Sequence, residues 1–558
     1  MMLKRILKHF HMCCGLGGGA KGFNRAKPVL GNIQAEWQCI GGVDVDPAGL
    51  RDFQRLSGVP GTLMDLFTRD QYIRFHSKEP PAAWKEATAQ DLRRAADNQR
   101  PDAVFISSPC KGASGLLSET MSLTPKYQAL NELTLRCIWL MCEAWKDDPV
   151  SLIVFENVPR LATRGRHLLD QINKLLGHYG YAVAETTHDC GVIGGLAQSR
   201  KRFLLVARHV EKVPPFLYEP EKKSLKSVGS ILGRMPLAGD IEAAGPMHRV
   251  PALQWKTWVR LALVTAGKDW RSLNELAIED GYLRDLVIVP EYHRGVLGVT
   301  GWNEPSGVVA GASRPMNGKY SVADPRAKTG ALQYQQYGVR RWDETSGAII
   351  GVKSPGQGTF SVADPRRPGE GFGKYLVTPW DQSAGTVIAG STTGQGAFAV
   401  QDPTPGMKRT KGDAYLTGGH YGVVNWSDQC GAVSASARQD NGRWSVADPR
   451  MPEANERLTC VIESLDGTWH RPFTTLELAA LQSLVEPEEM FELDGLSDQA
   501  WRERIGNAVP PAAAEAIAHV MGTTLLLAAA GETFMLNSMP IWVRPVAVGL
   551  SVSHQVTP

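Results

Sequence analysis

The chain has 558 residues, 43% hydrophobic and 21% charged, a composition typical of folded globular proteins that excludes disorder as the general state. The net charge of +3 and the pI near 8.3 are compatible with a nucleic-acid partner but do not require one. The nine cysteines lack paired Cys-x-x-Cys spacing, which argues against a disulfide framework and a structural zinc site, so we expect no bound metal and a cytoplasmic protein.

The first part of the chain, up to about residue 210, alternates short apolar runs with helix-like segments. Residues 103–107, 152–156 and 203–207 are continuous apolar runs with β-branched or aromatic side chains, a pattern typical of strands buried on both faces. Residues 130–145 have the length and the apolar content of a helix. This alternation predicts an α/β fold with a doubly wound parallel sheet.

Four internal repeats follow at about residues 295–450, where Gly, Pro, Ser and Thr become frequent. Each repeat has a tryptophan 22 residues before the aspartate of an Asp-Pro step: Trp302 and Asp324, Trp342 and Asp364, Trp380 and Asp402, Trp426 and Asp448. The constant spacing predicts one repeated unit, a pair of short strands closed by the Asp-Pro turn. An arginine follows in three repeats, as Arg326, Arg366 and Arg450. Arginine can bind guanine or phosphate, but we expect the repeats to be mainly structural.

Helical periodicity returns in residues 474–484 and 512–521. We therefore expect the α/β part to be interrupted by the repeats and completed by the C-terminal segment. The apolar stretch 523–531 is too short to span a bilayer and predicts a core helix.

A glycine-rich loop at residues 13–22 lies between an early strand and a helical stretch. Gly17, Gly19 and Gly22 match the pattern GxGxxG, and Asp44 follows at the end of the next strand. A backbone without Cβ atoms can approach a nucleotide closely, and such an acid can accept from ribose hydroxyls. The pattern alone fits a dinucleotide dehydrogenase, an S-adenosylmethionine site or a plain tight turn.

Polar side chains follow two of the apolar runs. Cys110 comes after the first run with Pro109 before it, and by itself it is more typical of a small buried thiol than of a nucleophile. Glu156 and Asn157 end the second run, where a carboxyl group can donate a proton or cap a turn. The carboxyl ends of parallel strands meet at one edge of a sheet, so we expect these groups to lie close together.

Two arginines, Arg200 and Arg202, lie between the candidate strands 181–187 and 203–209. If these strands are antiparallel, the arginines reach the same sheet edge as the cysteine and the glutamate. There they can grip a phosphate or a carbonyl oxygen, whereas a solvated basic loop is the alternative.

In this order and spacing the motifs resemble those of the DNA cytosine-C5 methyltransferases. The glycine loop, "SPC" (108–110), "ENV" (156–158), "QSRKR" (198–202) and "GNAVPP" (506–511) are similar to motifs of that family, and "RPFTTLELAALQSL" (471–484) is similar to a helix before the last motif. The resemblance covers roughly residues 1–235 and 470–525. The chain departs from the family at His11, Met12 and Cys13, where Asp-Leu-Phe is usual, and at Lys111, where glutamine is usual.

The resemblance implies a mechanism in which the thiolate of Cys110 adds to C6 of a cytosine that has been flipped out of the duplex. Glu156 would interact with N3 of the base, and Asn157 would orient the Glu156 loop. Arg200 and Arg202 would hold the base carbonyl and a flanking phosphate.

The resemblance also implies that the cofactor is S-adenosylmethionine. Glycines of the loop would pass beneath its methionine part, Asp44 would bind the ribose, Asp65 would meet the adenine amino group, and Asn507 and Val509 would close the pocket. The full set of expected cofactor-binding residues is Gly15, Leu16, Gly17, Gly18, Asp44, Val45, Asp65, Leu66, Pro109, Asn507 and Val509.

The expected fold is a Rossmann-like S-adenosylmethionine-dependent methyltransferase sheet interrupted by a β-rich target-recognition domain. Residues 1–215 and 466–558 would form the catalytic domain, and residues 216–465 the target-recognition domain. We expect a monomer that acts on double-stranded DNA, as in restriction-modification systems, and a cognate endonuclease is possible. A tRNA or RNA cytosine-C5 methyltransferase and a DNA-binding pseudo-enzyme without cofactor are the alternatives. A dehydrogenase is disfavoured, because hydride transfer needs neither the cysteine nor the arginine motif.

Overall fold

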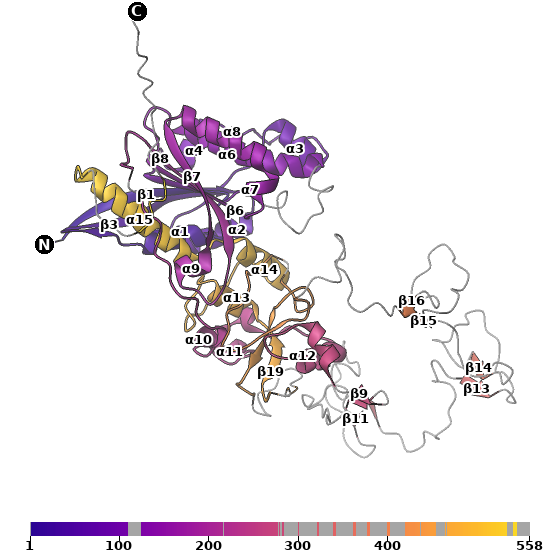
Figure 1. Ribbon diagram of the computed structural model, residues 1–558. Helices are drawn as coiled ribbons and strands as arrows, with labels where there is room; N and C mark the ends of the chain where they lie inside the picture. The colour runs from indigo at the N-terminus through magenta and orange to yellow at the C-terminus, as the bar shows by residue number, and fades with distance from the viewer. Residues whose placement is uncertain are drawn as a thin grey trace, which may run out of the picture. The chain divides into compact units, whose positions relative to one another are not determined.

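The computed structural model describes residues 2–109, 124–215, 217–276, 419–435, 437–452, 466–532 and 539–543, Ile462, Ser464, and short strands between residues 278 and 401. The chain divides into a larger compact part, Met1–Glu291 with Gly418–Pro558, and a smaller one, Tyr292–Thr417 (Figure 1). Cys110 and Lys111 lie outside the described residues.

An eight-stranded mixed sheet forms the centre of the larger part, in the order β2-β3-β1-β5-β6-β8-β7, with β4 paired to β3. Its strands are β1 (Leu3–Met12), β2 (Val29–Leu30), β3 (Ile33–Asp44), β4 (Thr62–Leu63), β5 (Ala103–Ile106), β6 (Leu152–Asn157), β7 (Tyr181–Asp189) and β8 (Lys201–His209). Strands β3, β1, β5 and β6 are parallel, whereas β8 is antiparallel to both β6 and β7. The three apolar runs are thus confirmed as adjacent buried strands, and the antiparallel pair that was required for the arginine loop is present.

Helices cover both faces of this sheet, because successive residues of a buried strand point to opposite sides. In β5, Val104 and Ile106 belong to the core under α4, α6 and α8, whereas Ala103 and Phe105 belong to the core under α1, α9 and α15. The helices of this domain are α1 (Gly18–Arg25), α2 (Pro47–Ser57), α3 (Arg69–His76), α4 (Ala89–Ala95), α6 (Pro125–Ala144), α7 (Leu161–Arg164), α8 (Arg166–His178), α9 (Cys190–Gly194) and α15 (Pro511–Ala529). The predicted helix at 130–145 is confirmed within α6.

The C-terminal helix α15 packs on the N-terminal glycine helix α1, as Figure 1 shows. Apolar residues of α15, among them Ile517 and Met521, are buried in the same core as Phe23 of α1. The stretch Asp498–Ala529 contains an 18-residue window apolar enough for a membrane span, with a mean hydropathy of 1.5, but 56% of that window is buried inside the protein. The expectation of a core helix, and of a fold completed by the C-terminal segment, is confirmed.

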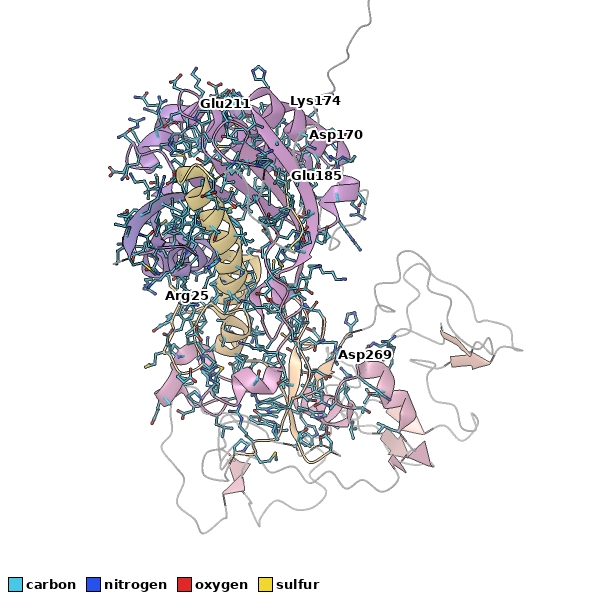
Figure 2. All side chains as sticks on the ribbon, turned by 60° about the vertical axis from the view of Figure 1, so that its left-hand side comes forward. Arg25, Asp170, Lys174, Glu185, Glu211 and Asp269 are labelled. Carbon is cyan, nitrogen blue, oxygen red and sulfur yellow. The ribbon has the colours of Figure 1, made fainter. Side chains whose placement is uncertain are left out.

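The edge strand β7 is fastened to helix α8 by charged side chains. Arg166 contacts both Asp170 of α8, at 2.9 Å, and Glu185 of β7, at 2.6 Å. Figure 2 shows Asp170, Lys174 and Glu185 on this side of the domain. These pairs are partly exposed, so they contribute little to stability compared with the apolar cores.

A second core of the larger part joins residues 228–247 to the fourth repeat and to the segment before α15. Its elements and those near it are α10 (Val228–Leu232), α11 (Ile241–Ala244), η1 (Pro246–His248), α12 (Trp255–Leu263), η2 (Trp270–Glu275), β9 (Ile278–Glu279), β10 (Tyr282–Leu283), β17 (Val423–Val424), β18 (Ser445–Asp448), β19 (Trp469–Pro472), α13 (Thr475–Leu481) and α14 (Asp498–Asn507). Strand β19 is antiparallel to β18.

Each of the four repeats contains a pair of short strands, as the constant spacing predicted. The smaller part has three of them, formed by β11 (Val299–Thr300), β12 (Ser321–Val322), β13 (Val339–Arg341), β14 (Ser361–Ala363), β15 (Val377–Pro379) and β16 (Ala399–Gln401). All four pairs are parallel, which corrects the expected closure by the Asp-Pro turn, because a tight turn can join only antiparallel strands. In the fourth repeat Asp448 ends the second strand instead. The tryptophans of the first three repeats, with Arg326 and Arg366, lie outside the described residues.

Candidate active site

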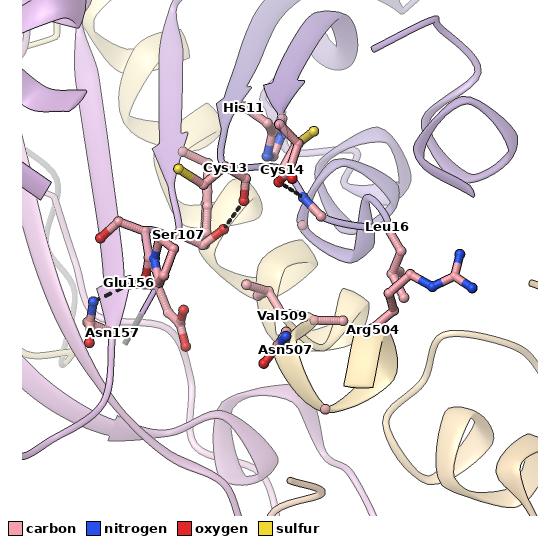
Figure 3. A pocket seen from close by; sticks show the side chains of 18 of the residues that line it. His11, Cys13, Cys14, Leu16, Ser107, Glu156, Asn157, Arg504, Asn507 and Val509 are labelled. Carbon is pink, nitrogen blue, oxygen red and sulfur yellow. Dashed lines mark hydrogen bonds between the residues drawn. The ribbon is translucent and has the colours of Figure 1, made fainter. Parts of the chain in front are cut away.

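One pocket lies at the carboxyl ends of β1, β3, β5 and β6, where open α/β sheets bind their ligands. Several predicted site residues line it: Gly15, Leu16, Asp44, Pro109, Glu156, Asn157, Arg200, Arg202, Asn507 and Val509. They come from segments up to 494 residues apart in the chain, Gly15 to Val509. Figure 3 shows the β6 residues on one side of this pocket and the glycine loop with the C-terminal Val509 on the other. The structure therefore brings the motifs together as the sequence predicted.

The glycine loop enters helix α1 through two left-handed turns. Gly15 and Gly17 have φ values of 52° and 92°, a conformation that favours glycine because it lacks a Cβ atom. The backbone N–H of Gly15 donates to the carboxylate of Asp44 at 2.8 Å, which fixes the loop against the end of β3. A Cβ atom added at Gly18 would overlap the carbonyl oxygen of Val509. The loop therefore packs directly against the C-terminal segment.

Asp44 is a buried carboxylate at the end of β3. Besides Gly15 it accepts from the backbone N–H groups of Val45, at 2.7 Å, and Asp46, at 3.0 Å. Burial raises its pKa above the ordinary value, an effect that these three N–H donors oppose. The carboxylate thus shapes the loop and also lines the pocket.

Glu156 and Arg202 form an ion pair at the opposite side of the pocket. Arg202 Nε lies 2.8 Å from Glu156 Oε1, and the two side chains are only 15% and 11% exposed. The antiparallel pairing of β6 with β8 produces this contact, because it brings the start of β8 alongside the end of β6. A guanidinium group held this way fixes the carboxylate in one orientation.

Asn157 links the end of β6 to the backbone just before Cys110. Its amide Nδ2 donates to the carbonyl of Ser108 at 3.3 Å, and its Oδ1 accepts from the N–H of Val158 at 2.8 Å. Ser108 is fixed in turn by a hydroxyl–hydroxyl bond of 2.6 Å to Thr134 of α6. These bonds fix the backbone that precedes Pro109 and the turn that follows β6.

Arg200 lines the pocket, but its guanidinium points into the protein. It is 1% exposed and donates to the carbonyl oxygens of Val433 at 2.8 Å, Gly506 at 2.8 Å and Ala508 at 3.1 Å. This geometry corrects the expected role in holding the base or a phosphate. Arg200 instead braces the closing segment around Asn507 against the fourth repeat.

The remaining predicted cofactor residues do not line the pocket. Asp65 is already engaged, since its carboxylate accepts from the N–H of Phe67 at 2.9 Å and from the indole of Trp84 at 3.0 Å. Leu66 is buried in the core and Val45 is 61% exposed. Gly17 and Gly18 belong to the turn of the loop, and Gly18 packs against the carbonyl oxygen of Val509.

Gly19 of the glycine pattern also lines the pocket, and several lining residues were not predicted from the sequence, namely Cys14, Asp46, Phe105, Ser107, Ser108, Val158, Arg504, Gly506 and Ala508. Each one flanks or belongs to a recognised motif, so sequence position alone was a usable signal. His11 and Cys13 also line the pocket, at two positions where the chain departs from the family pattern.

Among the residues that the structure describes, no cluster of three His, Cys, Asp or Glu side chains could hold a metal ion.

A mixed α/β sheet with a glycine loop and an acid after the second long strand is consistent with an S-adenosylmethionine-dependent methyltransferase fold. Residues 7–240 match the family model of the C-5 cytosine-specific DNA methylases. The matched segment is less than half of the chain and contains strands β1, from Leu7 onward, to β8 with the glycine loop, Glu156 and Arg202.

Similar solved structures include the Entamoeba histolytica methyltransferase EhMeth, with 10% identity, a TM-score of 0.44, and coverage of 93% of this chain and 98% of that one. Dnmt2 of S. pombe has 11% identity and a TM-score of 0.41, with 94% and 98% coverage. A DNMT2 variant of Spodoptera frugiperda has 11% identity and a TM-score of 0.41, with 93% and 99% coverage. No curated protein matches the chain.

Proposed function

We propose that this protein transfers a methyl group from S-adenosylmethionine to C5 of cytosine within a specific sequence of double-stranded DNA. The observation that best supports the proposal is the position of the Glu156–Arg202 pair, which lines the same pocket as the glycine loop and Asp44. The same pocket thus has, on one side, a carboxylate that can bind a cytosine ring and, on the other side, a glycine loop that can bind a nucleotide.

The residues of the pocket fit the proposed cofactor. The glycine loop presents backbone without Cβ atoms, and its turn is fixed by the bond from Gly15 to Asp44. Asn507 and Val509 line the same side of the pocket. When bound, the cofactor supplies an electrophilic methyl group on a positively charged sulfur.

Glu156 and Arg202 would activate the base. C5 of cytosine is a weak nucleophile until the Cys110 thiolate adds to C6 and turns the ring into an enamine. Glu156 at N3 stabilises the charge that develops there, and Arg202 keeps the carboxylate in place through its 2.8 Å contact. The activated C5 would then take up the methyl group as the S–CH3 bond breaks and S-adenosylhomocysteine is released, and loss of the C5 proton to water and of the Cys110 thiolate would restore the aromatic ring.

Asn157 would position the nucleophile. Its bond to the Ser108 carbonyl fixes the backbone just before Pro109, next to which the nucleophile follows in the sequence. The base must leave the helix to reach this pocket, which costs about a few kcal/mol of unstacking.

Trapping on DNA that contains 5-fluorocytosine tests the proposal, because fluorine at C5 prevents the elimination step. We expect a covalent protein–DNA adduct that requires the cofactor and disappears in Cys110→Ala. The matched control Cys142→Ala, which alters a buried thiol of α6, should retain the adduct. No adduct, or an adduct that survives Cys110→Ala, would refute the mechanism.

The substrate is tested separately with label from the methyl group of the cofactor. We expect incorporation into plasmid DNA but not into tRNA, and bisulfite sequencing of the plasmid should give one sequence context. Labelling of tRNA alone would replace DNA by RNA as the substrate.

A further inference from the structure

Two buried histidines and an asparagine form a chain of hydrogen bonds behind the glycine loop. His9 and His11 lie on β1, and both side chains are almost fully buried. His9 Nδ1 lies 2.8 Å from His11 Nε2, and His9 Nε2 lies 2.9 Å from Oδ1 of Asn24 in helix α1. None of the proposed catalytic steps uses these groups. His11 nevertheless lines the pocket (Figure 3).

The orientation of the Asn24 amide determines which ring nitrogens of His9 and His11 carry protons. Its Nδ2 donates to the Ser57 carbonyl at 2.8 Å, and its Oδ1 accepts from the N–H of Cys39 at 3.2 Å. The oxygen therefore faces His9, so His9 Nε2 must carry the proton. A neutral His9 then has a bare Nδ1, which can only accept, and the proton between the two rings lies on His11 Nε2.

Both rings are neutral at physiological pH. Burial lowers the pKa of His9 from 6.5 to about 4, although the bond to Asn24 opposes this shift. Burial, and secondly the neighbouring His9, lower the pKa of His11 well below its ordinary value. Since His11 Nε2 carries the proton, His11 Nδ1 has an unprotonated lone pair.

The bare nitrogen of His11 faces the pocket. The ring edge with Cε1 and Nδ1 lies over Gly19, where an added Cβ would be 3.4 Å from Nδ1, and the ring stacks on Phe105 with centroids 5.6 Å apart. Within the described part of the chain, no hydrogen bond satisfies His11 Nδ1. The pocket thus has a hydrogen-bond acceptor above the start of helix α1 that has no donor among the described residues.

The order of the strands identifies this donor. The sheet runs β3-β1-β5-β6, so His11 lies between Asp44 at the end of β3 and the Glu156 side at β6. With the ribose at Asp44 and the methyl group directed towards the cytosine near Glu156, the amino-acid part of the cofactor would lie over β1. Its only strong donor is the α-ammonium group, because its carboxylate can only accept.

We infer that His11 Nδ1 binds the α-ammonium group of S-adenosylmethionine and that His9 and Asn24 hold His11 in the tautomer that can do so. A protonated or Nδ1–H histidine would repel this cation, whereas a neutral acceptor attracts it. The inference rests on the proposed function, because it assumes that this pocket binds the cofactor.

Calorimetry with S-adenosylhomocysteine and with its deaminated analogue, in which hydrogen replaces the amino group, tests the inference. We expect the wild-type protein to lose at least about tenfold in affinity for the analogue. In His11→Leu the two ligands should bind within about twofold of each other, and His11→Asp should restore the preference. Asn24→Leu should weaken it, because His9 loses the acceptor that sets its tautomer.

The control is His209→Leu, which changes a buried histidine at the end of β8 that does not line the pocket. This variant should discriminate between the ligands as the wild type does. Undiminished discrimination in His11→Leu would overturn the inference while leaving the proposed function intact. Failure of the wild type to bind S-adenosylhomocysteine would instead overturn the proposed function and the inference with it.

Discussion

Arg471 forms a fully buried ion cluster that joins the fourth repeat to the segment before the C-terminal helix. Its guanidinium lies 2.7 Å from Asp448 of β18 and 2.7 Å from Glu477 of α13, and all three side chains are 0% exposed. Burial opposes ionisation of Glu477, but Arg471 holds the pKa of this carboxyl below its ordinary value. The cluster is therefore stable only while all of its charges are present.

Replacement of Arg471 by methionine should destabilise the protein strongly. Asp448 keeps a second partner, Arg450, at 3.0 Å, whereas Glu477 is left with no cation within ion-pair distance among the described residues. Removal of one partner from a buried pair costs about 3–5 kcal/mol. With an unfolding entropy of about 2.1 cal/mol/K per residue, a unit of the size of the larger part loses about 1 °C per kcal/mol, so Arg471→Met should lower the Tm by about 3–5 °C at neutral pH. The deficit should shrink below about pH 5, because protonation of Glu477 removes the unpaired buried charge.

Thermal unfolding followed by circular dichroism measures this cost. Arg471→Met combined with Glu477→Gln should recover at least half of the lost Tm, because the double variant has no unpaired carboxylate. The control is Arg234→Met at the exposed pair with Glu488, whose side chains are 51% and 55% exposed and which should contribute about 0–1 kcal/mol. Equal effects of Arg471→Met and Arg234→Met, or a double variant no more stable than the single one, would refute the reasoning.

Three further outcomes follow from the site. Gly18→Ala should weaken calorimetric binding of S-adenosylhomocysteine at least about tenfold, because the new Cβ meets the carbonyl of Val509, whereas Gly177→Ala, with open space around its Cβ, should not change the affinity. Arg200→Met should also weaken this binding, because the closing segment loses its three carbonyl contacts; unchanged affinity would contradict the bracing role. Burial lowers the pKa of His9 to about 4, so the stability that depends on its neutral form is complete above pH 6.5. This stability decreases by about 3 kcal/mol as the pH falls to about 4. The Tm of His9→Gln should therefore depend less steeply on pH than the Tm of the wild type over that range.

The sequence predicted the parts of the site that depend on local pattern. A strand buried on both faces must be apolar along its whole length, so the runs that became β5, β6 and β8 were visible, and so were the polar residues at their ends. The role of Arg200 was not visible, because its partners Val433 and Gly506 are more than 200 residues away in the chain. The predicted contact of Asp65 with the cofactor was wrong for a similar reason, since its carboxylate accepts a hydrogen bond from the indole of Trp84.

The register of the strand pairs explains the spacing of the repeats. The sequence shows this spacing but does not show whether the paired strands are parallel or antiparallel. Val424 of β17 is paired with Val446 of β18, an offset of 22 residues, and the same offset holds in the other three pairs. Two residues after the paired Val424 and Val446, the same offset joins Trp426 to Asp448, so their spacing follows from parallel pairing. Arg450 then lies over the Trp426 ring at 5.0 Å while it bonds to Asp448. The arginine of this repeat is thus part of the packing between strands, which supports a structural role over base recognition.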